Sequence, residues 1–69
     1  MAYYIVNVNK DDNGKHEVHE TTCQHLPHYT NQHALGYHAD CESALRAAET
    51  AGYAPADGCW HCSRPCHTG

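Results

Sequence analysis

The sequence has few of the large apolar side chains that normally build a protein core. Among its 69 residues there is no phenylalanine, one methionine and one tryptophan, and the main bulky residue is tyrosine, with five copies. A domain of about this length buries only roughly 60% of the surface of its unfolded chain. Such small folds usually need disulfides, a bound metal or a partner to stay folded. We therefore expect a single domain over residues 1–69 that something besides an apolar core holds together.

Positive charge is scarce as well. Lysine and arginine together number 4, against 8 aspartates and glutamates, so the net charge is −4 with histidine neutral. Because affinity for nucleic acids depends largely on Lys and Arg contacts to phosphates, this balance disfavours a nucleic-acid partner. We expect an unknown protein partner instead, and a chain that is itself a monomer.

The sequence also lacks long hydrophobic runs and targeting signals. No apolar stretch approaches the length of a transmembrane helix, so no membrane contact is expected. The segment from Met1 to Val8 has neither the basic start nor the cleavage site of a secretory signal. These features predict a cytoplasmic protein. In that reducing compartment, clustered cysteines are typical of metal binding or redox chemistry.

The first half of the chain predicts three strands. The aromatic and β-branched stretch 2–9 has the composition of a strand. Asn13-Gly14 is a strong turn signal, and the more polar stretch 15–21 can return from it as a second strand, which gives an N-terminal β-hairpin. After a loop over 22–32, a short third strand is expected over 34–38.

The second half predicts one main helix, from Asp40 to Ala51. Asp40 can accept hydrogen bonds from the free N–H groups of the first turn, and small apolar residues recur at helical spacing after it. Gly52 is the type of residue that ends helices. A loop over 54–58 and a compact turn over 59–69, which we call the cysteine knuckle, would follow, with one helical turn after Ser63. The fold class predicted is therefore α+β, stabilised by zinc.

Two pairs of candidate metal ligands lie far apart in this sequence. Cys59 and Cys62 form a C-x-x-C pair, whose two intervening residues allow a tight turn to direct both sulfurs at one tetrahedral ion. His19 and Cys23 form an upstream H-x-x-x-C pair at the end of the second predicted strand. We predict one structural Zn²⁺ bound by His19, Cys23, Cys59 and Cys62. Zinc bound in this way can contribute on the order of 10 kcal/mol to folding.

The fourth ligand has alternatives, although spacing favours His19. Cys66 could fold back on the ion that Cys62 binds, and His67 follows it directly. Cys41, at the start of the predicted helix, is interpreted as a small buried residue with a free thiol. The C-x-x-C pair could itself be a disulfide, a reduced pair without metal or a thioredoxin-like redox motif, but the βαβ unit that normally surrounds such a motif is missing here.

The ordered set of these features resembles the N-terminal metal-binding domain of the Ada DNA-repair methyltransferase. The resemblance spans about residues 15–62. It is carried by His19 with Cys23, Leu35-Gly36-Tyr37-His38, Ser43-Ala44-Leu45, Gly52-Tyr53, Pro55, and Cys59 with Cys62. The resemblance implies a small zinc domain with one ion held by the two pairs, and it strengthens the choice of His19.

The resemblance does not extend to repair activity. In the Ada domain, the first position of the upstream pair is a cysteine that accepts a methyl group, and here that position is His19. The loop that follows the pair is basic in Ada, whereas residues 24–28 of this chain contain no arginine. We therefore expect a zinc-binding domain that is not an enzyme, of unknown biological role, acting as a protein-interaction module. The alternatives are a nucleic-acid-binding module of the Ada-like type and a thiol redox or metal-handling protein.

Overall fold

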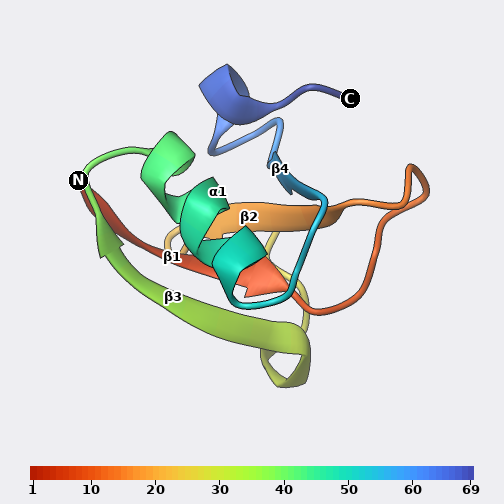
Figure 1. Ribbon diagram of the computed structural model, residues 1–69. Coiled ribbons are helices and arrows are strands. Elements are labelled where there is room, and N and C mark those ends of the chain that lie inside the picture. The colour runs from red at the N-terminus through yellow and green to blue at the C-terminus, as the bar shows by residue number, and fades with distance from the viewer.

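Four strands form one mixed sheet in the computed structural model, which describes residues 1–69 (Figure 1). Their order across the sheet is β3-β1-β2-β4. The strands are β1 (Ala2–Asn7), β2 (His16–Glu20), β3 (Gln32–His38) and β4 (Ala56–Gly58). β1 pairs antiparallel with β2 and with β3, and β4 pairs parallel with β2. The predicted α+β class and the N-terminal hairpin are confirmed.

The hairpin register places each residue at the end of β2 opposite a residue of β1. Tyr4 of β1 lies opposite Glu20 of β2, and Ile5 lies opposite His19. Because neighbouring residues of a strand face opposite sides of the sheet, Tyr4 and Glu20 face one side and Ile5 and His19 the other. The turn has Gly14 at φ +77°, a left-handed conformation that Gly adopts at little cost.

The single α-helix, α1 (Cys41–Thr50), begins and ends where the sequence predicts. The Asp40 carboxylate accepts a hydrogen bond from the Ser43 N–H at 2.9 Å and so caps the first turn. Gly52 has φ +100° just beyond the last turn, which suits glycine at this end of a helix. The α-helix lacks the length and the hydrophobicity of a membrane-spanning segment.

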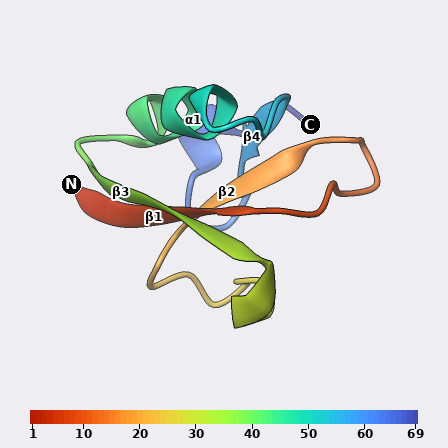
Figure 2. The same cartoon turned by 60° about the horizontal axis from the view of Figure 1, so that its bottom comes forward.

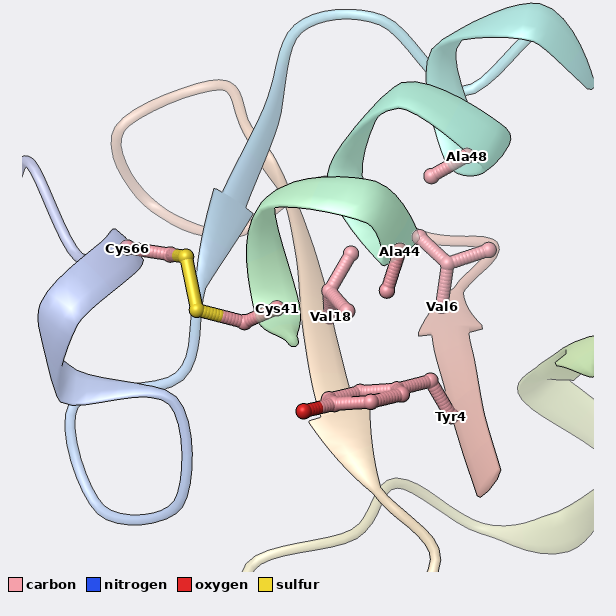
Figure 3. Packing of buried hydrophobic residues seen from close by; sticks show 7 residues of the cluster. All are labelled: Tyr4, Val6, Val18, Cys41, Ala44, Ala48 and Cys66. Atoms are coloured by element: carbon pink, nitrogen blue, oxygen red, sulfur yellow. A yellow bond between two sulfur atoms is a disulfide. The ribbon is translucent and has the colours of Figure 1, made fainter. Parts of the chain in front are cut away.

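The apolar core lies between α1 and one face of the sheet. Val6 and Val18 are fully buried there and meet Ala44 and Ala48 of the helix (Figure 3). Figure 2 shows the helix on one side of the sheet, and the segment of about residues 21–31 on the other side. The core contains no side chain larger than Tyr4, in agreement with the expected shortage of apolar material.

Two short segments differ from the prediction. The predicted loop 54–58 contains β4, because Ala56, Asp57 and Gly58 extend along the free edge of β2 although none of them favours strands. β3 starts at Gln32, two residues before the predicted start, directly after a 3₁₀ turn over Tyr29–Asn31. The turn predicted after Ser63 is present as a 3₁₀ helix, η2, over Arg64–Cys66.

A disulfide joins Cys41 to Cys66, so the prediction that Cys41 keeps a free thiol is wrong (Figure 3). Both cysteines are buried, at 9% and 5% exposure. The prediction failed because the packing of η2 against the start of α1 cannot be read from local sequence. The bond connects the cysteine knuckle to the helix, and it leaves Cys23, Cys59 and Cys62 as the free cysteines.

Gly58 is where β4 comes closest to the cysteine knuckle. A Cβ at this position would lie 2.5 Å from the Ser63 carbonyl oxygen and 2.7 Å from the Cys66 Cβ. Gly58→Ala is therefore expected to lower the free energy of unfolding by about 2–3 kcal/mol, the upper part of the usual cost of overpacking, because two of the contacts are with backbone atoms. Denaturant titration measures the change.

Gly14→Ala is the control for this substitution. Nothing lies within 4 Å of a Cβ added at Gly14, and only the φ of +77° opposes it. A cost of about 1 kcal/mol is expected there. Equal effects of the two variants would contradict the close packing at Gly58.

Candidate metal centre

The two predicted ligand pairs meet at one end of β2. His19 lies within β2, and Cys23 follows in a turn closed by a hydrogen bond from the Cys23 N–H to the Glu20 carbonyl at 3.0 Å. The cysteine knuckle approaches from β4, where the Cys59 N–H donates to the Val18 carbonyl at 3.0 Å. Backbone pairing with β2 therefore positions both pairs.

The ligand atoms of His19, Cys23, Cys59 and Cys62 all lie within 4.8 Å of one another. The Sγ atoms of Cys23 and Cys59 are 3.9 Å apart. Two sulfurs that bind one tetrahedral zinc at about 2.3 Å are separated by about 3.8 Å. The spacing of these sulfurs thus fits a shared ion, and this cluster could hold a metal ion.

The imidazole of His19 is oriented as a ligand would be. The residue is 2% exposed, and its Nδ1 is buried without a hydrogen-bond partner. An unpaired buried nitrogen is costly unless an ion or another group satisfies it. The other ring nitrogen, Nε2, lies 3.5 Å from the Glu17 carboxylate. Metal-bound histidines commonly direct their second nitrogen at a carboxylate in this way, which fixes the ring orientation.

Backbone N–H groups surround the three sulfurs. The Glu20 N–H points at Cys62 Sγ at 3.3 Å, and the N–H groups of His25 and His61 point at Cys23 and Cys59 at 3.4 Å. Such donors stabilise negative charge on sulfur, as thiolate ligands require. The turns that supply the ligands therefore also supply their hydrogen-bond donors.

Burial at the cluster favours the uncharged forms of Cys62 and His19. Burial and, to a smaller extent, a hydrogen bond with Cys23 raise the pKa of the Cys62 thiol to about 12, although the Glu20 N–H acts in the opposite direction. Burial also lowers the pKa of His19, with a smaller effect from His25, so its ring is neutral as a ligand must be. A bound metal ion would deprotonate its thiol ligands and so oppose the raised pKa of Cys62.

The alternative ligands are engaged elsewhere. Cys41 and Cys66 are joined in the disulfide. The His67 Nδ1 lies 3.0 Å from the Gly58 carbonyl oxygen and 3.6 Å from the Asp57 carboxylate. The ring of His67 therefore contacts β4 and not the cluster. None of these three alternatives is among the residues whose ligand atoms gather at the cluster.

Sequence reasoning missed Glu17 as a part of this site. The signal was present, since Glu17 and His19 are two residues apart on a strand and so share one face of the sheet. The stacking of His25 on His61, with ring centroids 3.7 Å apart, was also not predicted. These two rings line an outer hollow of about 360 Å³ beside Cys23 and Cys62.

Removal of the Glu17 carboxylate should weaken metal binding while keeping the ligands. Glu17→Ala is expected to lower metal affinity by about tenfold, because the His19 ring loses the partner that orients it. Competition with a chromogenic chelator measures this change. Asp12→Ala, which removes an exposed carboxylate in the hairpin turn, is the control and should leave the affinity unchanged.

No protein-family model, curated protein or solved structure matches the chain.

Proposed function

We propose that the chain is a non-enzymatic zinc-binding domain that acts through contacts with other proteins. One Zn²⁺ bound by His19, Cys23, Cys59 and Cys62 would hold the second strand and the cysteine knuckle together. The observation that carries this proposal is the gathering of four ligand atoms within 4.8 Å, with a buried and unpaired His19 nitrogen among them.

The choice of zinc rests on the donor set. Three thiolates and one imidazole in tetrahedral spacing suit zinc, which has no redox chemistry and favours closed sites of four protein ligands in structural roles. Tetrahedral sulfur sites are otherwise typical of iron–sulfur centres. Elemental analysis of the purified protein separates these cases. One zinc per chain supports the proposal, and iron or the absence of bound metal would contradict it.

A structural role is favoured over catalysis because the protein itself fills all four positions. Catalytic zinc sites keep one position open for water or substrate. Reaction of the Cys41–Cys66 disulfide with a partner's thiol is also disfavoured, since both cysteines are at least nine-tenths buried. The cytoplasmic location stays a prediction, and the disulfide itself is of the kind that persists in oxidising compartments.

Kinship with the Ada metal-binding domain belongs to the same proposal. It is supported by the two ligand pairs and by the order of strands and helix between them. With His19 at the first ligand position, the site has no thiolate there to accept a methyl group. A nucleic-acid role has little support, because the chain has only four lysines and arginines against eight aspartates and glutamates. A gel-shift titration at low salt tests it, and binding at micromolar protein would revive that alternative.

A further inference from the structure

A second hollow lies on the helix side of the sheet, between the start of α1 and Cys62 of the metal centre. Its volume is about 360 Å³, within the range of pockets that hold small ligands or single side chains. We call it the acidic pocket, and the residues that define it here are Tyr4, Glu20, Asp40, Glu42, Cys62 and Pro65. It combines the ends of β2, α1 and η2, which are far apart in the sequence.

Tyr4 gives the first indication that this pocket receives a ligand. The ring lies in the core, where the residue as a whole is only 5% exposed, and Tyr4 also lines the pocket, yet no hydrogen bond within the protein engages its hydroxyl. In Figure 3 the hydroxyl end of the ring points away from Val6, toward the side where Cys41 lies. The phenolic oxygen is therefore free to accept a hydrogen bond from a group bound in the pocket.

The charges around the pocket are of one sign. Glu20, Asp40 and Glu42 contribute carboxylates, and no lysine, arginine or histidine is among the lining residues. Burial raises the pKa of Tyr4, and the negative charges of Glu20 and Asp40 raise it further. The start of α1 contributes only about half a positive charge, which is too little to offset three carboxylates. An anion is therefore excluded as the occupant and a cation is favoured.

We propose that the acidic pocket binds an arginine side chain of a partner protein. The apolar part of the lining, which includes Pro65 and the Cys41–Cys66 disulfide, suits the stem of a long side chain. A guanidinium is weakly hydrated and carries five N–H donors in a planar fork, which fits several carboxylates and a phenolic oxygen better than an ammonium does. This inference rests on the proposed role in protein contacts and names the chemistry of the partner.

Zinc would strengthen this preference. Three thiolates and a neutral imidazole leave the zinc complex with a formal charge of about −1. Cys62 lines both the metal site and the pocket, so this charge would lie beside the bound cation. The net charge of −4 would also attract basic partners over longer distances. The carboxylates of the pocket carry their charge whether or not metal is present.

The test is a ¹H–¹⁵N NMR titration of metal-loaded protein with Nα-acetyl-arginine methylamide. We expect saturable shifts at the amides of Glu20, Glu42 and Ser63, with a Kd of about 1–10 mM for so small a ligand. The citrulline analogue, which has nearly the same shape without charge, should produce no saturable shift. The lysine analogue should bind at least about threefold more weakly.

Two variants locate the site. Glu42→Gln and Tyr4→Phe should each weaken arginine binding by about threefold or more. Tyr4→Phe should fold normally, because the hydroxyl has no partner to lose, and Glu42→Gln changes an exposed residue. Asp12→Asn removes the same charge from the distant hairpin turn and should leave the affinity unchanged.

Several outcomes would overturn the inference. These are equal binding of citrulline, equal or tighter binding of lysine, shifts that lie outside the pocket, or equal losses in Asp12→Asn and Glu42→Gln. Absence of binding with one zinc still bound per chain would remove the arginine site alone. Absence of metal from the protein would instead contradict the proposed function, so the two failures can be told apart.

Discussion

Replacement of Cys59 by serine is expected to unfold the protein at neutral pH. Cys59 is 2% exposed, and its sulfur lies 3.9 Å from that of Cys23. Serine cannot supply a thiolate, so the metal would lose one of four ligands. Structural zinc contributes on the order of 10 kcal/mol to folding, which is comparable to the whole stability of a typical domain, about 5–15 kcal/mol. Dispersion of the amide NMR signals and the metal content of the purified variant measure the effect.

A histidine outside the cluster provides the control for Cys59→Ser. His33 lies on β3, is exposed and is absent from the candidate ligand set. His33→Gln should keep one metal ion per chain and a dispersed spectrum. A Cys59→Ser variant that is folded and free of metal would show that the apolar core alone sustains the fold, and the proposed structural role of the ion would then fail.

The double variant Cys41→Ala with Cys66→Ala is expected to be folded but less stable, by about 3–4 kcal/mol. The two cysteines are separated by 25 residues, so their bond restricts a long segment of the unfolded chain. Alanine retains most of the small buried volume at both positions and leaves no new thiol near Cys62. Denaturant titration of the metal-loaded protein measures the loss, and native protein is the reference.

Metal content of the same double variant decides between the ligand sets. Because neither residue contributes to the cluster, the variant should still bind one metal ion with nearly native affinity. Loss of the ion, or a changed ligand set in the absorption spectrum of the Co²⁺ form, would place Cys66 among the ligands. Cys66, and not His19, would then be the fourth ligand, as the sequence alternative proposed. The disulfide between Cys41 and Cys66 would not form in the metal-bound protein.

Local signals in the sequence were sufficient for most of the fold. Asn13-Gly14 marked the turn between the hairpin strands, and Asp40 and Gly52 bounded the helix, because turns and caps depend on residues that are close in sequence. β4 could not be predicted in this way. Ala56, Asp57 and Gly58 form a strand only because the edge of β2 is available to them, which is a property of the tertiary structure.

The candidate site was predicted to the extent that spacing determines it. The short intervals within the His19–Cys23 and Cys59–Cys62 pairs favour chelation, and the fold brings the two pairs together. The partner of Cys41 was not predictable, because pairing among five cysteines depends on which distant segments touch. The acidic pocket could not be predicted from the sequence for the same reason, because β2, α1 and η2 each contribute only part of its lining.

Zinc titration of metal-free protein, with the disulfide intact and oxygen excluded, tests the central claim most directly. Amide signals in the ¹H–¹⁵N NMR spectrum would follow folding, and the ring nitrogens of His19 would report coordination through Nδ1. We predict a poorly dispersed spectrum without metal that becomes fully dispersed at one equivalent of Zn²⁺. A dispersed spectrum before zinc is added, with no change afterwards, would contradict a metal ion as the element that holds this fold together.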